Sequence, residues 1–490
     1  MKTLRRNMCA CAIVVVFLFI ANCSSLFSQD LKNATNQADY VVITPASYML
    51  LADRLAAFRH LHDSFTTMVV PFDSVLAQFG TATSPDSALR SFIQYTLKEW
   101  QHPSPKYLVL AGNVNTIPSH REPDPLYPLL VNDDSLYIDH WFVEDPSRVT
   151  GSYGQAQAVL CRLPAWDSAG LNVMIEKQIA YDTSTVGAWC GRSLGLADVD
   201  SMAFNIFELV LNDQQSILAP VWHDTESIHI NTSSPLYQDP EAFKEAWNRG
   251  ASIMVYCGHA NDTVLSATRY FTTSTVGSLT NGNRLPVCFL EGCNLRFDTR
   301  PSTSIPVHLL QQPGGGAVAC VASAGPNYEQ LIERTTASIF THLIADPDQT
   351  AGMAFKLARN EDPESMMRRL TFLGDPAIRI KSPGIVANIP KPIGVPSTFG
   401  LRQNFPNPFN PSTTIAFTIA GDLAKGRGGE RVRLSVYDLL GREVAVLVDG
   451  METAGEHSVK FDASRLASGV YIYTLHAGGL VQSKRMVLVK

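Results

Sequence analysis

Short, continuously apolar runs alternate along this chain with segments whose apolar residues recur at the spacing of one helical face. Residues 40–43 and 67–70 predict strands, and residues 106–112 (KYLVLAG) predict a third strand that is apolar on both faces. Helical patterns over residues 50–61 and from Pro85 onward separate these strands. The order of strand and helix predicts an α/β fold, in which helices cover a parallel sheet.

The same alternation starts again near residue 193. The run SLGLADV is followed by a helical pattern from Met202 to Leu211, by residues 219–224 in the place of a strand, and by a helical pattern over 240–249. A second group of strands and helices is therefore expected after the first.

Three further apolar runs, over residues 252–256, 286–290 and 317–322, each lead into small or polar residues. In an open α/β sheet, ligands bind outside the carboxyl ends of the strands. We therefore expect the three junctions to share one site, which makes His259 and Cys293 potential neighbours.

The composition argues against several classes of protein. The chain has 490 residues with 39 basic and 45 acidic side chains and no long Lys/Arg block. Nucleic acid is therefore not expected as a partner, because it requires a concentrated positive patch. The spacings of Cys and His do not match those of structural zinc sites, so no metal ligands are predicted.

The first 28 residues have the pattern of a signal peptide. Lys2, Arg5 and Arg6 precede an apolar run over residues 9–21 that is too short for a comfortable membrane span. A lipoprotein anchor at Cys23 is the alternative. No later segment is apolar for long enough to predict a transmembrane helix, so the mature chain is expected to be exported and soluble.

His259 and Cys293 have the side chains that nucleophilic catalysis needs. A cysteine nucleophile requires a base that generates thiolate and backbone N–H groups that stabilise the developing oxyanion. The turns at Gly258 and Gly292 place the N–H groups of Ala260 and Cys293 as candidates for the second task. The alternative is a buried structural thiol and a hydrogen-bonded histidine, the interpretation that we give to Cys257 and Cys288.

Four segments carry a resemblance to a known family. SIMVYCGHAND, PVCFLEGCNLRF, GGGAVACVASAG and LTFLGDPAIRI resemble the gingipain family of cysteine peptidases, in the caspase-like clan, over about residues 38–382. The resemblance implies a caspase-like three-layer α/β sandwich with an N-terminal subdomain over 38–185 and a catalytic subdomain over 186–382. It implies an endopeptidase in which Cys293 attacks the scissile carbonyl, His259 acts as acid and base, and the N–H groups of Ala260 and Cys293 form the oxyanion hole. No cofactor is implied for catalysis.

Two departures from the family pattern bear on activity. The family usually has glycine where this chain has Ala260, and a positive φ there would cost alanine about 1 kcal/mol. Residues 300–310 (RPSTSIPVHLL) contain two prolines where the family tends to place a helix with a glutamate, which predicts a remodelled loop. Two alternatives therefore stay open: an inactive surface-binding protein on the same scaffold, and a sortase-like processing enzyme of the secretion system.

Acidic residues suggest further roles. The family resemblance makes Asp200 the candidate for recognition of a basic P1 side chain, with Asp198 as its competitor. Both residues are alternatively explained as leading into and capping the helix from Met202. A structural calcium ion at Asp133, Asp134 and Asp139 is the alternative to a solvated acidic loop. The role of Glu291, which lies beside the cysteine, stays open.

The last part of the chain forms a separate module. Residues 383–398 are rich in proline and predict a linker, and residues 399–490 show short strands between Gly, Asp and Asn turns, which predicts an immunoglobulin-like β-sandwich. LRQNFPNPFNPSTTIAFTI and the terminal KRMVLVK resemble the sorting domain of the type IX secretion system of Gram-negative bacteria. The resemblance implies a secreted or cell-surface protein whose partners are the secretion machinery and protein or peptide substrates. An adhesive β-sandwich is the alternative.

Overall fold

The computed structural model describes residues 30–80, 84–123, 135–145, 154–200, 205–298, 304–326, 329–361, 369–383, 400–404, 406–419, 430–438, 441–452, 455–477 and 480–489. The chain divides into two compact units, residues 1–385 and 386–490. The predicted signal peptide and nearly all of the predicted linker lie outside the described residues.

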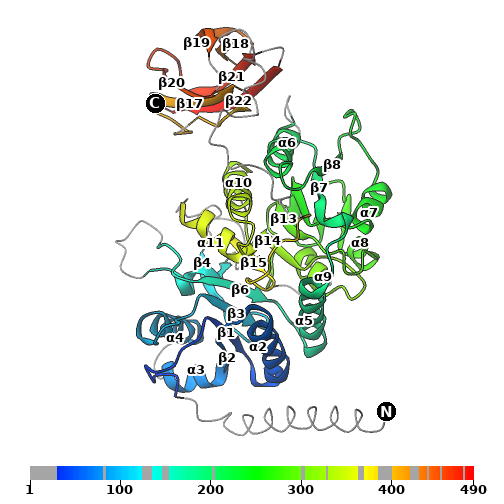
Figure 1. The fold of residues 1–490 in the computed structure, drawn as a ribbon, viewed down its shortest axis with the longest axis vertical. Helices are drawn as coiled ribbons and strands as arrows, with labels where there is room; N and C mark the ends of the chain where they lie inside the picture. The colour runs from blue at the N-terminus through cyan, green and yellow to red at the C-terminus, as the bar shows by residue number, and fades with distance from the viewer. Residues whose placement is uncertain are drawn as a thin grey trace, which may run out of the picture. The chain divides into compact units, whose positions relative to one another are not determined.

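In the described part of the chain, a ten-stranded sheet forms the centre of the first unit (Figure 1). The strand order is β2-β1-β3-β6-β15-β14-β13-β9-β7-β8. The strands are β1 (Tyr40–Thr44), β2 (Thr67–Pro71), β3 (Tyr107–Ala111), β6 (Val159–Leu163), β7 (Arg192–Ala197), β8 (Asp224–His229), β9 (Ile253–Cys257), β13 (Val287–Glu291), β14 (Ala319–Ser323) and β15 (Leu370–Leu373).

The sheet contains two groups of parallel strands. Strands β2, β1, β3 and β6 are parallel neighbours, as are β8, β7, β9, β13 and β14. Between the groups, β15 is antiparallel to β14 and pairs with β6 in parallel through Leu373 and Arg162. The two groups therefore run in opposite directions, and the carboxyl ends of β9, β13 and β14 lie at one edge of the sheet.

Alternation along β1 explains how helices cover both faces. Tyr40 and Val42 pack in one core cluster with residues of α2 and α5, and Val41 and Ile43 pack in another with residues of α3 and α4. Successive side chains of a strand point to opposite faces, so an uninterrupted apolar run requires helices on both sides. The helices of this half are α2 (Met49–Asp63), α3 (Phe72–Phe79), α4 (Pro85–Glu99) and the crossover helix α5 (Ser168–Thr183).

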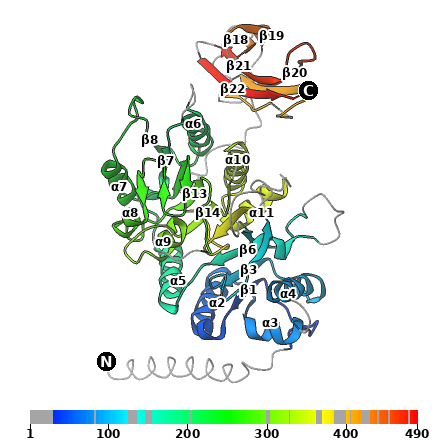
Figure 2. The ribbon, with the colours of Figure 1, turned by 180° about the vertical axis from the view of Figure 1, so that it is seen from behind.

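The second group of strands is covered in the same way (Figures 1 and 2). Helix α6 contacts β7, β8 and β9, and α10 contacts both β13 and α6, whereas α9 contacts β14 and α5. The helices are α6 (Ile206–Leu218), α7 (Pro240–Asn248), α8 (Thr273–Gly277), α9 (Ile305–Gln311), α10 (Glu329–Ala345) and α11 (Ala351–Glu361).

Two elements differ from the sequence-based expectations. Strand β8 begins at Asp224, whereas residues 219–224 were expected in the strand position. It is an edge strand whose first four residues are exposed or half-buried, so it lacks the apolar run of a central strand. Helix α6 begins at Ile206 with Asn205 as its N-cap, so neither Asp198 nor Asp200 caps it.

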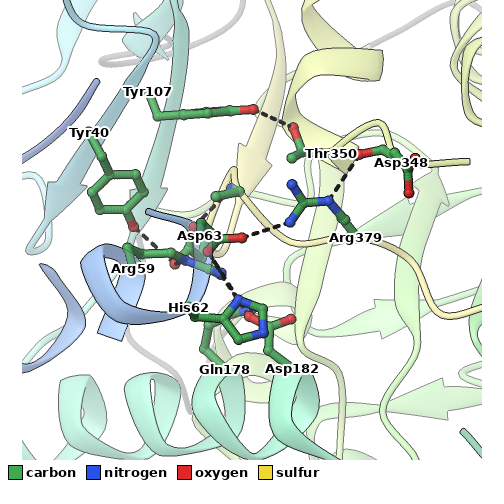
Figure 3. A network of polar contacts seen from close by, with 12 residues as sticks. Tyr40, Arg59, His62, Asp63, Tyr107, Gln178, Asp182, Asp348, Thr350 and Arg379 are labelled. Atoms are coloured by element: carbon green, nitrogen blue, oxygen red, sulfur yellow. Dashed lines mark hydrogen bonds and ion pairs between the residues drawn. The ribbon is translucent and has the colours of Figure 1, made fainter. Parts of the chain in front are cut away.

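A buried cluster of charged residues joins α2 and α5 to the segment after β15 (Figure 3). Arg59 of α2 is fully buried and forms ion pairs with Asp63, with Asp182 of α5 and with Asp375, which follows β15. The hydroxyl of Tyr40 also donates to Asp375, at 2.9 Å. A buried guanidinium is tolerated when carboxylates balance its charge, so these ion pairs fix α2 and α5 against the segment after β15.

The second unit consists of antiparallel strands. Its described strands form two sheets, β16-β17-β20 and β19-β18-β21-β22, around one buried apolar core. The fold class expected from the sequence, a caspase-like α/β sandwich followed by an immunoglobulin-like β-sandwich, is confirmed. The strands are β16 (Gly400–Leu401), β17 (Ser412–Ile419), β18 (Glu430–Tyr437), β19 (Glu443–Glu452), β20 (Gly455–Asp462), β21 (Gly469–Ala477) and β22 (Leu480–Leu488).

None of the helices in the described residues has the length and apolar character needed to cross a membrane.

Candidate active site

The paired strands β9 and β13 position the two loops of the candidate site. Their register places Cys257 opposite Glu291, and the N–H of Gly258 donates to the carbonyl of Glu291 at 3.1 Å. His259 and Cys293 are each the second residue beyond the end of their strand. Because the two strands are parallel and in register, both residues emerge at the same edge of the sheet.

The two loops also touch each other. A Cβ atom placed on Gly292 would lie 2.5 Å from the Cβ of Ala260 and 3.1 Å from the carbonyl oxygen of Gly258. Any side chain at position 292 would therefore push the cysteine loop away from the histidine loop. The residue before Cys293 thus packs directly on the residues that flank His259.

The backbone of His259 is held firmly while its side chain stays exposed. Its N–H donates to Asp198 Oδ2 at 3.1 Å, and its carbonyl accepts from the N–H of Ser266 at 2.8 Å and from the hydroxyl of Tyr256 at 2.5 Å. The imidazole lies edge-on to the ring of Phe207 in α6, with the centroids 5.1 Å apart. This arrangement orients an accessible histidine on a rigid backbone.

The buried carboxylate of Asp198 supports the backbone of the loop that contains His259. Asp198 follows β7, it is buried, and its carboxylate accepts hydrogen bonds from the N–H groups of His259 and Val199. Its Oδ2 also lies 3.3 Å from the hydroxyl oxygen of Tyr256. A Cβ on Gly258 would lie 2.3 Å from the Cβ of Asp198, so this close approach requires glycine. From the sequence, Asp198 was predicted to act in specificity or helix capping, and this supporting role was not predicted.

Asp200 is half-buried and lies just before residues 201–204, which are outside the described residues. Its role in substrate specificity remains a prediction.

Cys293 begins a loop that is attached to the end of β14. The cysteine is partly buried and is not part of a disulfide. Asn294 adopts a φ of 54°, a left-handed conformation that asparagine tolerates better than most residues. The N–H groups of Asn294 and Leu295 donate to the carbonyls of Gly325 and Ser323 at 3.0 and 2.8 Å. The third predicted strand junction therefore supports the cysteine loop.

Ala260 does not carry the strain that a positive φ would impose. It lies in the short strand β10 (Ala260–Asn261), paired with β11 (Val264–Leu265), and the described non-glycine residues with positive φ are Ser64, Ser266, Arg269 and Asn294. Replacement of the family's glycine by alanine therefore leaves the backbone of this loop in an ordinary conformation.

The proline-containing segment after the cysteine loop forms a helix. Residues 299–303 lie outside the described residues, and α9 begins at Ile305 with Pro306 in its first turn, where proline is tolerated. The N-cap Ser304 accepts a hydrogen bond from the N–H of Val307 at 3.4 Å. At the other end, the buried Lys177 of α5 donates to the carbonyls of Leu309 and Leu310. The prolines predicted a loop over residues 300–310, whereas Ile305–Gln311 form helix α9.

A buried carboxyl group, that of Glu291, lies at the end of β13, just before the cysteine loop. The carboxyl of Glu291 accepts hydrogen bonds from Gln214 Nε2 at 2.5 Å and from the thiol of Cys257 at 3.3 Å. Burial raises the pKa of Glu291 to about 7. Cys257 and Cys288 are buried in the core, as expected from the sequence.

Of the three residues considered for calcium, only Asp139 is described. Its two carboxylate oxygens accept from Arg162 Nε and Nη2 at 2.6 and 2.7 Å. Asp133 and Asp134 lie outside the described residues, so a calcium site there stays a prediction.

Family models match both parts of the chain. Residues 33–381 match Peptidase family C25, and residues 403–490 match a secretion system C-terminal sorting domain. None of the curated proteins matches this sequence.

Solved structures show the same fold at low sequence identity. The Arg-specific cysteine proteinase gingipain R (RgpB) has a TM-score of 0.56 at 17% identity, over 94% of this chain and 99% of its own. The complex of the pro- and mature domains of RgpB from Porphyromonas gingivalis gives a TM-score of 0.56 at 17% identity, over 92% of this chain and 100% of that one.

The sorting domain indicates a secreted or cell-surface protein. Since the first family model covers most of the sequence, the chain belongs to peptidase family C25 and is a cysteine-type peptidase.

Proposed function

We propose that this protein is a secreted cysteine endopeptidase in which Cys293 is the nucleophile and His259 is the general acid and base. The observation that carries the proposal is the contact between the two loops: Gly292 packs against Ala260 where the paired strands β9 and β13 end. This packing brings a partly buried thiol and an exposed imidazole to the same edge of the sheet.

Peptide hydrolysis at this site proceeds in two stages. The thiolate of Cys293 attacks the scissile carbonyl, and His259 protonates the leaving amine, which leaves an acyl-enzyme. His259 then removes a proton from water, the resulting hydroxide attacks the thioester, and the thiol of Cys293 is regenerated. The N–H groups of Cys293 and Ala260 stabilise the oxyanion in both stages, a contribution worth about 100-fold or more in rate. Catalysis requires no cofactor.

Two further assignments belong to this proposal. Asp200 pairs with a basic P1 side chain of the substrate, because it follows the strand next to β9 at the edge that holds His259. Residues 399–490 present the chain to the secretion machinery and are removed at the cell surface.

The test is cleavage of a peptide library that varies at P1, by the protein without its signal peptide and sorting domain. The parent and the Cys293→Ala variant are compared, with Cys288→Ala as the control for loss of a buried thiol. Cleavage by the parent and by Cys288→Ala that disappears in Cys293→Ala supports the proposal. A preference for Arg or Lys at P1 that is lost in Asp200→Asn supports the specificity assignment.

The other outcomes identify the alternatives. If the parent cleaves no peptide and its Cys293 reacts with iodoacetamide no faster than a buried thiol, the chain is a binding protein on a peptidase scaffold. Transfer of the acyl group to an added amine in place of water would identify a sortase-like enzyme.

A further inference from the structure

Asp262 lies three residues after His259, between the two short strands of the histidine loop. Its Oδ1 accepts a hydrogen bond from the backbone N–H of Arg296 at 3.0 Å. Its backbone carbonyl accepts from the N–H of Ile305, the first residue of α9, at 2.8 Å. A single residue of the histidine loop thus holds both the cysteine loop and the helix that follows it.

Arg296, which lies three residues after Cys293, is held from several directions. Its carbonyl accepts from the hydroxyl of Ser304 at 2.6 Å, and its guanidinium pairs with both carboxylate oxygens of Asp298, at 2.9 and 2.5 Å. The guanidinium also lies over the ring of Tyr137 in β5 (Ser135–Ile138), a strand of a separate two-stranded sheet, at 5.9 Å from the ring centroid. The backbone N–H that reaches Asp262 therefore belongs to a well-anchored residue.

The loop that contains His259 and the loop that contains Cys293 contact each other at three places. The first contact is the hydrogen bond from the N–H of Gly258 to the carbonyl of Glu291 at the strand ends, and the second is the packing of Gly292 against Ala260. The third is the hydrogen bond between Arg296 and Asp262, each of which lies three residues after a member of the candidate dyad. We infer that Asp262 is a positioning residue, which sets the distance between the thiol of Cys293 and the imidazole of His259. This inference rests on the proposed peptidase function.

The burial of Asp262 supports a specific role. Burial raises the pKa of its carboxyl to about 6, and the nearby carboxylate of Asp298 acts in the same direction, while Arg296 opposes the shift. Burial of this carboxyl group costs free energy, and the hydrogen bond from the N–H of Arg296 offsets part of that cost. Because the bond ends on a backbone N–H, an acceptor oxygen at this position is required, and a full negative charge is not.

The test compares Asp262→Ala with Asp262→Asn. The amide oxygen of asparagine still accepts from the N–H of Arg296, whereas alanine leaves the cysteine loop without this contact. Asn261→Ala is the matched control, because within the described residues the side chain of Asn261 accepts hydrogen bonds from Thr263 and Val264 of its own loop. Each variant is measured for kcat, KM, melting temperature and the pH profile of Cys293 alkylation by iodoacetamide.

We expect Asp262→Ala to remain folded and to lose kcat by about 100-fold, with KM changed far less, because a misplacement of about 1 Å costs that much in rate. The midpoint of its alkylation profile moves up toward that of an ordinary thiol, because His259 no longer stabilises the thiolate. Asp262→Asn recovers most of the activity, and Asn261→Ala keeps the parental alkylation profile.

The inference is overturned if folded Asp262→Ala keeps the parental kcat and alkylation profile, or if Asp262→Asn is as impaired as Asp262→Ala. These results differ from failure of the proposed function, in which the parent itself neither cleaves peptides nor shows an activated Cys293.

Discussion

The thiol of Cys257 donates a hydrogen bond to the carboxyl of Glu291 at 3.3 Å, and each of these residues lies two positions before a member of the candidate dyad. The pair is buried, and Gln214 of α6 also donates a hydrogen bond to the carboxyl. The loops that carry His259 and Cys293 therefore follow strand ends that contain a buried carboxyl group, whose ionisation depends on pH.

The Glu291→Gln variant is expected to be more stable than the parent at pH 8. Burial raises the pKa of Glu291 from 4.5 to about 7 in the folded protein. Between these values the folded state binds more protons than the unfolded state, so stability falls as pH rises, and the full cost of the buried charge is present above pH 7. We expect an advantage of about 1–3 kcal/mol for the variant at pH 8 that shrinks toward pH 4.5. Urea unfolding at several pH values measures it, with the exposed Glu241→Gln as control.

Lys177 gives a prediction of the opposite sign. Burial lowers its pKa from 10.5 to about 7, so between these values the unfolded chain binds more protons and stability rises with pH. The free energy of unfolding of the parent, relative to Lys177→Met, should therefore increase from pH 6 to pH 9. Lys98→Met, at a position whose side chain is 82% exposed, should show no such trend. A flat difference for Lys177→Met would show that the buried amine does not titrate in this range.

The contact between the two loops predicts that Gly292→Ala reduces kcat/KM by about 10-fold to 100-fold, because the added methyl group displaces Cys293 from His259. Ala260→Gly removes the atom that this methyl group would strike, so the double variant should regain part of the lost activity. Gly450→Ala, at a position in the sorting domain with nothing within 4 Å of the added atom, is the control. Additive losses in the double variant would contradict the packing argument.

The buried ion cluster predicts a large loss of stability. Arg59→Met leaves Asp63, Asp182 and Asp375 without their shared cation, which should cost about 3–5 kcal/mol. Arg54→Met on the same helix removes an ion pair whose side chains are 45% and 55% exposed, and it should cost less than about 1 kcal/mol. Chemical denaturation of both variants measures the contrast. Equal effects would show that burial does not determine the contribution of these pairs.

The sequence was most informative where local patterns are strong. The apolar runs of β1, β3, β9, β13 and β14 predicted the central strands, because strands buried on both faces need uninterrupted apolar residues. The sequence was less informative for strands whose residues have no distinctive hydrophobic pattern and whose position depends on the strands beside them. The polar edge strand β8 was shifted, and β15, which joins the two groups of strands, was not assigned as a strand, since its four residues carry no period of their own.

The sequence alone determined the class of fold, the order of the two modules and the identity of His259 and Cys293 as candidates, because these follow from hydrophobic pattern and from motifs within single segments. Only the tertiary structure decided that Asp198 holds the backbone of His259 and that Asp262 holds the N–H of Arg296. The physical reason is that each of these hydrogen bonds joins loops that are distant in sequence. Their donors are backbone N–H groups, which every residue type except proline carries, so the type of residue does not reveal them in the sequence.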